Sequence, residues 1–203
     1  SGESRWITAP QARRDVQRLR AQSSAILSTS ATVLADDPSL TVRWEELDDA
    51  SRAAYAREDL RQPTRVIIDS QNHVTPRHRL INLPGNTLLA RLQADQQPWP
   101  EQVEQLLVPE LRQKVDLVSL LMLLGKRQLN TLWVEAGASL AGALLTAGVV
   151  DEVIVYVAPK LLGDNARGLC QLPGLSQLAD APTFSFSDVR QVGPDLRLTL
   201  TPR

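Results

Sequence analysis

The chain has 203 residues, of which 43% are hydrophobic, and its formal net charge is −1 at pH 7. This length can close one sizeable core, so we expect one domain over residues 1–203, and the charge leaves no broad basic field for nucleic acid. No apolar run reaches the roughly 20 residues of a membrane span, no signal region opens the chain, and Cys170 is the single cysteine, so we expect a cytoplasmic protein without disulfides that binds neither membranes nor nucleic acid.

The first half of the sequence predicts a helix followed by strands. The helix spans residues 10–22, because Thr8 can cap it, proline suits its first turn and one face is apolar. Short apolar runs predict strands at residues 25–29, 65–69 and 87–91. The expected connections are a polar loop over 32–38, a surface helix or insertion over 47–60, and a loop over 72–85.

The second half predicts further alternation of helices and strands. Asp116 can cap a helix over 117–124 that Gly125 ends. A strand at 131–135, a helix at 139–147 and a strand at 152–158 are typical of a unit whose two strands pair in parallel through a right-handed crossover. Alternating segments at 183–192 and 196–201 predict an antiparallel hairpin. The fold class is therefore α/β with a mixed sheet.

A glycine turn at Gly137 lies between a predicted strand and a predicted helix. Free N–H groups of a first helical turn and the helix dipole favour an anion, and Gly137 and Gly142 allow close approach. The alternative is a tight turn with a glycine for helix packing, because the spacing matches neither a dinucleotide fingerprint nor a P-loop. Glu135 ends the strand, where a carboxylate can accept hydrogen bonds from sugar hydroxyls.

Two adjacent acids, Asp36 and Asp37, follow the predicted strand at 25–29 and suggest a cleft, although either can simply cap a turn. Arg20 and Arg43 are either solvated surface charges or a pair that converges on one loop to hold a phosphate. The two histidines share a polar loop without a third plausible ligand, so we expect no metal site.

Four segments together resemble the reductase domain of bifunctional riboflavin-pathway deaminase-reductases, which has a dihydrofolate-reductase-like fold. They are residues 2–8 (GESRWIT), 31–43 (ATVLADDPSLTVR), 134–142 (VEAGASLAG) and 158–163 (APKLLG). The resemblance covers nearly the whole chain and implies a mostly parallel mixed sheet flanked by helices, with a C-terminal antiparallel hairpin. It also implies NADPH as cofactor and 5-amino-6-(5-phosphoribosylamino)uracil as substrate, whose ribose is reduced to the ribityl form.

The resemblance also implies site residues. Substrate-binding positions are Ser4, Arg20, Leu40, Arg43 and Glu135. Nicotinamide contacts fall on Trp6, Thr32 and Asp36, and cofactor-phosphate contacts on Gly137, Ala138, Ser139, Leu140, Ala141, Gly142 and Ala143. We expect Asp36 to be the catalytic residue, orienting the hydride transfer or relaying the proton that must reach the developing charge.

The sequence also departs from that family. It begins at the GESRWIT motif, without the apolar strand that precedes the motif in the family, and without the upstream deaminase domain. Apolar positions in the C-terminal hairpin, Phe184, Phe186 and Val189, predict a homodimer. Two other functions stay open: a dihydrofolate reductase, against which Arg20 on the early helix argues, and a non-catalytic module for nucleotide binding or oligomerisation.

Overall fold

The computed structural model describes residues 6–54 and 56–203. The chain divides into two compact units, one of Gln17–Gly137 and one of the chain start up to Val16 together with Ala138–Arg203. None of the helices in these described ranges has both the length and the apolar character that crossing a membrane requires.

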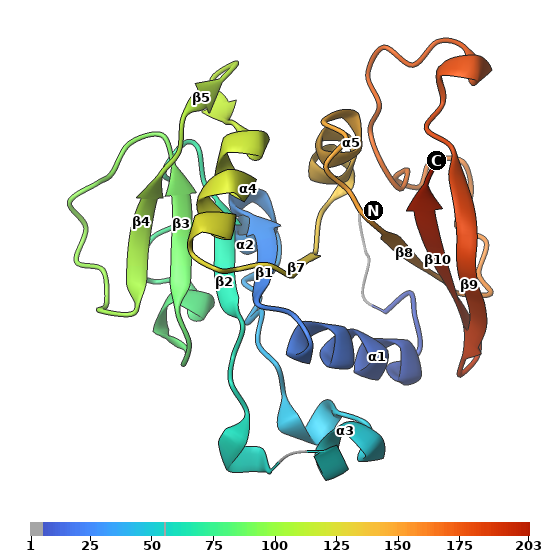
Figure 1. Ribbon diagram of the computed structural model, residues 1–203, viewed down its shortest axis with the longest axis horizontal. Coiled ribbons are helices and arrows are strands. Elements are labelled where there is room, and N and C mark those ends of the chain that lie inside the picture. The colour runs from blue at the N-terminus through green and yellow to red at the C-terminus, as the bar shows by residue number, and fades with distance from the viewer. Residues whose placement is uncertain (1–5, 55) are drawn as a thin grey trace. The chain divides into compact units, whose positions relative to one another are not determined.

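The first unit is built on a sheet of five parallel strands (Figure 1). Its order is β4-β3-β2-β1-β7, with neighbours paired in parallel. The strands are β1 (Ala25–Thr29), β2 (Thr64–Ile68), β3 (Thr87–Arg91), β4 (Val103–Leu107) and β7 (Leu132–Val134). The sequence predicted all of these except the edge strand β4, whose mixture of polar and apolar residues lacks a strand signal. A short hairpin, β5 (Glu110–Leu111) with β6 (Lys114–Val115), follows β4.

Successive strand residues face opposite sides of this sheet and bury two separate cores. On one side Leu27 and Val66 pack with Leu120 and Leu124 of helix α4 (Leu117–Lys126). On the other side the neighbouring strand residues Ile26, Ile67 and Leu89 pack with Val33, Leu40 and the 3-10 turn Arg79–Asn82. Burial on both faces explains why these strands are continuous apolar runs in the sequence.

The remaining helices of the described residues are α1 (Pro10–Ala21), α2 (Ser30–Asp36), α3 (Asp49–Ala54) and α5 (Ala138–Thr146), with further 3-10 turns at Trp44–Glu46, Arg57–Asp59 and Leu178–Asp180. The expected polar loop over 32–38 is wrong in large part, because α2 occupies most of it. Thr29 caps this helix by accepting from the Thr32 N–H, and Val33 is fully buried, so packing and a cap stabilise a helix despite the acidic sequence. Gly125 also lies inside α4 rather than ending it.

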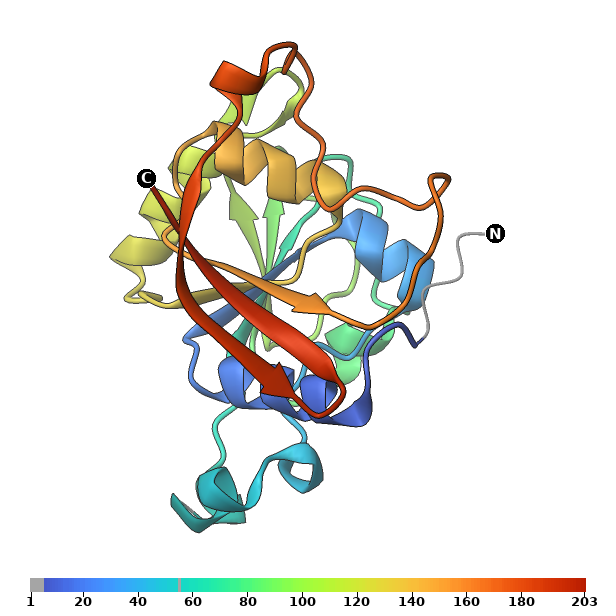
Figure 2. The same ribbon diagram turned by 90° about the vertical axis from the view of Figure 1, so that its right-hand side faces the viewer.

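The second unit contains a three-stranded antiparallel sheet in the order β8-β10-β9, drawn in orange to red in Figure 2. Its strands are β8 (Val153–Val157), β9 (Phe184–Val192) and β10 (Asp195–Pro202), and β9 with β10 forms the predicted hairpin. The expected parallel pairing around α5 is wrong: β7 pairs with β1, whereas β8 pairs antiparallel with β10. An apolar run indicates that a segment forms a strand, but the strand with which it pairs depends on the tertiary structure.

Two fully buried arginines fix the loops of the first unit. Arg91, at the end of β3, donates Nε and Nη2 to one oxygen of Asp69 at 3.0 and 2.8 Å. Asp69 also accepts the backbone N–H groups of His73 and Val74, so the loop after β2 is tied to β3. Burial lowers the pKa of Arg65 to about 10, which leaves it charged at neutral pH, and its guanidinium donates to the carbonyls of residues 83–85.

Asp69→Asn should therefore destabilise the protein by about 3 kcal/mol, because an amide NH2 would face N–H donors and leave a buried guanidinium undercompensated. Urea unfolding at neutral pH measures this loss. The control is Asp49→Asn, which removes an exposed carboxylate paired with Arg52 and should leave the midpoint unchanged. An equal midpoint for Asp69→Asn and the parent would contradict the structural role of the buried pair.

Candidate functional site

The parallel alignment of the first unit gathers polar residues at the carboxyl edge of its sheet. Thr29 ends β1 opposite Ile68 at the end of β2, so α2 and Asp69 begin next to each other. Glu135 continues β7, because its N–H donates to the Leu27 carbonyl at 2.9 Å. Ligands bind at this edge in open α/β sheets.

The main side-chain interaction at this edge joins Arg20 to Glu135. Arg20 Nε donates to Glu135 Oε1 at 2.6 Å and Nη2 donates to Oε2 at 2.8 Å, a bidentate charge-assisted pair. Nη1 donates to the Thr41 carbonyl at 2.8 Å. The side chains retain 12% and 25% of their exposure, so the pair is partly open to solvent, unlike the buried pair of Asp69 and Arg91.

The segment from Leu40 to Arg43 is held by two glutamines that sequence reasoning missed. Gln62 donates to the Val42 carbonyl and accepts its N–H, at 2.9 and 2.8 Å, as a neighbouring strand would. Gln17 is 2% exposed and accepts the Arg43 N–H at 2.8 Å. Leu40 is buried in the left-handed region with φ 49°, a strained conformation for leucine that the surrounding contacts hold.

The two predicted arginines have separate partners. Arg20 pairs with Glu135, whereas the half-exposed Arg43 pairs with Glu46 at 2.6 Å. Their connection runs through the backbone, since Arg20 binds the Thr41 carbonyl. The phosphate hypothesis for the two guanidinium groups together therefore stays a prediction.

The two acidic residues Asp36 and Asp37 also have different surroundings. Asp37 takes the left-handed position that ends α2, and its carboxylate accepts the Arg79 N–H at 2.8 Å, which is a structural role. Asp36 is the exposed last residue of α2. Thr32, the other predicted nicotinamide contact on this helix, is half-buried, and its hydroxyl lies 3.3 Å from that of Thr29.

The predicted phosphate turn lies where the first unit ends and the second begins. α5 starts at Ala138, directly after Gly137, and space around a Cβ built on Gly137 is open for 4 Å. Position 142 requires glycine for a different reason. A Cβ there would collide with the Gln171 carbonyl, so Gly142 allows the loop at residue 171 to pack closely against α5. Ser139 donates to the Gln171 side chain at 2.6 Å.

Trp6 lies in the second unit, exposed, with the Arg13 guanidinium 4.3 Å from its ring centroid. Ser4 lies outside the described residues. Within the described ranges, no group of three or more His, Cys, Asp and Glu side chains is arranged to hold a metal ion.

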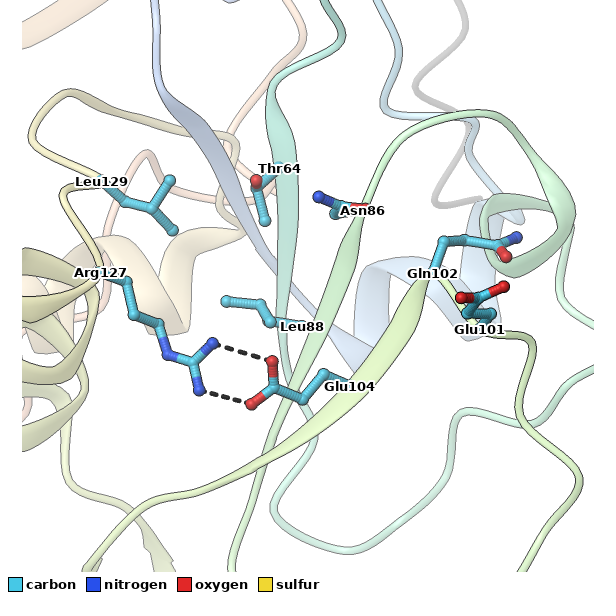
Figure 3. Close-up of a pocket in the computed structure, with 8 residues that line it drawn as sticks. All are labelled: Thr64, Asn86, Leu88, Glu101, Gln102, Glu104, Arg127 and Leu129. Atoms are coloured by element: carbon cyan, nitrogen blue, oxygen red, sulfur yellow. Dashed lines mark hydrogen bonds and ion pairs between the residues drawn. The ribbon is translucent and has the colours of Figure 1, made fainter.

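A cavity of about 310 Å³ lies at the opposite, amino edge of the sheet (Figure 3). Thr64 at the start of β2 and Leu88 of β3 line it, together with the pair of Glu104 and Arg127. The hydrogen bonds from Arg127 lower the pKa of Glu104. None of the predicted site residues lines this cavity.

The sequence matches the family model described as "RibD C-terminal domain" over residues 1–198, and the chain belongs to this family. It is 65% identical over 200 residues to "Riboflavin biosynthesis protein RibD" of Escherichia coli (strain K12), covering 98% of the chain and 54% of that protein. It is 42% identical to "5-amino-6-(5-phosphoribosylamino)uracil reductase" of Buchnera aphidicola subsp. Acyrthosiphon pisum, covering 100% of the chain and 98% of that protein.

A solved structure supports the same family. The fold is similar to that of Acinetobacter baumannii RibD, with a TM-score of 0.82 at 34% identity, over 100% of this chain and 53% of that one. The chain thus spans about half the length of most of the RibD relatives it matches. The expected fold class is confirmed: α/β, with a parallel five-stranded sheet flanked by helices and a C-terminal antiparallel sheet.

Proposed function

We propose that residues 1–203 act as a reductase domain that uses NADPH to reduce the ribose of 5-amino-6-(5-phosphoribosylamino)uracil to the ribityl product. The observation that carries this proposal is the match to nearly the whole of the Buchnera protein named for that activity. The Arg20–Glu135 pair at the carboxyl edge supports it, since a polyhydroxy sugar needs such acceptors and donors. An upstream deaminase domain belongs to the same proposal.

The chain offers a fitting position for the cofactor. The open space beside Gly137 and the N–H groups of the first turn of α5 suit a phosphate, so the turn that begins at Gly137 would hold the cofactor phosphates, whereas the Gln171 carbonyl covers Gly142. Trp6, Thr32 and Asp36 would contact the nicotinamide. When bound, NADPH supplies the hydride.

The chain's own residues bind the sugar and handle the proton. Opening of the ribose ring leaves C1′ double-bonded to the nitrogen of the pyrimidine amine, as an imine. Reduction adds a hydride to C1′ and a proton to that nitrogen, so the C1′–N bond is kept in the ribityl product. Asp36, exposed at the end of α2, orients the exchange or relays this proton. Ser4, Leu40 and Arg43 hold the phosphorylated sugar, and Glu135 accepts a hydrogen bond from one of its hydroxyls.

The protein should oxidise NADPH in the presence of the phosphoribosylamino-pyrimidine and should not do so with dihydrofolate. Absorbance at the NADPH band measures both reactions. Replacing NADPH by NADH should lower the rate by about ten-fold or more, because one charge-assisted contact to the 2′-phosphate is worth about 1.5–3 kcal/mol. Activity with dihydrofolate alone would overturn the assignment, and binding of NADPH without either reaction would favour a non-catalytic module.

Substitutions of Asp36 and of Arg43 should change different kinetic constants. Arg43→Gln removes a charged donor and should raise KM for the pyrimidine by about ten-fold to a hundred-fold with little change in kcat. Asp36→Asn keeps the shape and should lower kcat by about a hundred-fold while NADPH affinity is kept. Steady-state kinetics and fluorescence titration separate the two. A near-parental kcat for Asp36→Asn would show that Asp36 does not take part in the reaction.

We also propose a homodimer through the antiparallel sheet of the second unit. Paired residues of neighbouring strands share a face, and one face carries Val157 of β8, Leu196 of β10 and Val189 and Phe186 of β9, which are 42%, 43%, 55% and 67% exposed. On the other face Tyr156 and Arg197 both donate to Asp15 of α1. Exposed apolar side chains gathered on one face favour an isologous contact between two copies.

Val189→Asp should convert the dimer to a monomer, because the contact would bury an unpaired carboxylate. Light scattering at a protein concentration well above typical dimer dissociation constants measures the mass. Arg190→Gln, on the opposite face of the same strand, is the control and should keep the dimer. A monomeric parent protein would exclude this contact.

A further inference from the structure

Three N–H donors converge on the Glu135 carboxylate, and they are shared unequally between its oxygens. Oε1 accepts from Arg20 Nε at 2.6 Å and from the indole Nε1 of Trp133 at 2.9 Å. Oε2 accepts from Arg20 Nη2 at 2.8 Å. Each carboxylate oxygen offers about two acceptor positions, so Oε1 is filled while one position stays on Oε2.

Trp133 reaches this carboxylate because of the strand period. Residues 133 and 135 point to the same side of the continuing β7 strand. The ring of Trp133 packs against the core cluster that contains Ile26, Val33 and Leu40. The donor is therefore anchored by the core, whereas a carboxylate's own terminal torsion has only a broad preference.

We propose that Trp133 is a positioning residue for sugar recognition. By filling Oε1, it fixes the rotation of the Glu135 carboxylate and directs Oε2 to accept one hydroxyl of the substrate. The same contact keeps Arg20 Nη2 beside Oε2, so that a hydroxyl can donate to the oxygen while it accepts from the guanidinium. A phosphate cannot donate at neutral pH in its dianionic form, and the carboxylate repels it, so this pair selects hydroxyl over phosphate.

This inference rests on the proposed function, and it makes the separate prediction that loss of the indole N–H weakens sugar binding alone. Trp133→Phe keeps an aromatic ring in the core and removes the donor. Its affinity for ribose 5-phosphate, which carries the sugar hydroxyls, should fall by about ten-fold, the worth of about 1.4 kcal/mol. Its affinity for inorganic phosphate should not change. The parent and the variant are titrated with each probe by calorimetry.

The matched control is Trp99→Phe. Trp99 packs against the same core cluster, and its indole also donates to an arginine-paired carboxylate, that of Asp95, at 2.7 Å. A general effect of removing a tryptophan would appear in both variants, whereas the proposed role predicts unchanged ribose 5-phosphate affinity for Trp99→Phe. In an Arg20→Ala background, Trp133→Phe should add no further loss, because the two residues act through one carboxylate.

A second measurement needs no variant at position 133. In protein labelled with ¹⁵N at the tryptophan indoles, ribose 5-phosphate should shift the Trp133 indole resonance and leave that of Trp99 in place. Equal ribose 5-phosphate affinity of parent and Trp133→Phe, or an indole resonance that the sugar leaves unmoved, would overturn the role of Trp133. A parent protein that binds the sugar but does not reduce the pyrimidine would instead overturn the proposed function.

Discussion

The parallel alignment of β1, β2, β3, β4 and β7 is the constraint on which the candidate site depends. Parallel strands all end at one edge, so the segments that follow them begin side by side. This alignment places α2, the loop after Asp69 and Glu135 at a common edge although they are far apart in sequence. The two apolar cores on opposite faces of the sheet stabilise this arrangement.

Two arginine–carboxylate pairs at this edge differ in their exposure to solvent. Arg91 and Asp69 are fully buried. Their hydrogen bonds with the backbone of His73 and Val74 tie the loop after β2 to β3. The guanidinium of Arg20 instead binds both oxygens of Glu135, and both side chains keep part of their surface in solvent. A pair of the first kind is costly to disturb, whereas one of the second kind retains donor and acceptor positions for a ligand.

Neutral side chains orient the partly exposed pair of Arg20 and Glu135. Gln62 and Gln17 hold the backbone of the segment that Arg20 contacts, and Trp133 holds the carboxylate that Arg20 binds. Because glutamine and tryptophan side chains carry no net charge, they orient neighbouring groups without neutralising them. The candidate site is thus a charged pair whose neighbours Gln17, Gln62 and Trp133 are neutral.

The sequence by itself determined the fold class and most of the strands, because apolar periodicity is a local property of the chain. The site positions Arg20, Asp36 and Glu135, which follow from motif spacing and the family resemblance, stay predictions. Only the tertiary structure decided that residues 30–36 form a helix, that β8 pairs with β10 and that Arg20 binds Glu135. It also revealed Gln17, Gln62 and Trp133. Gln17 and Gln62 bind backbone groups that are distant in sequence, and no local pattern of residues encodes such partners. Trp133 and Glu135 share a strand face, which is a local property, but the packing of the indole ring decides that its N–H meets the carboxylate.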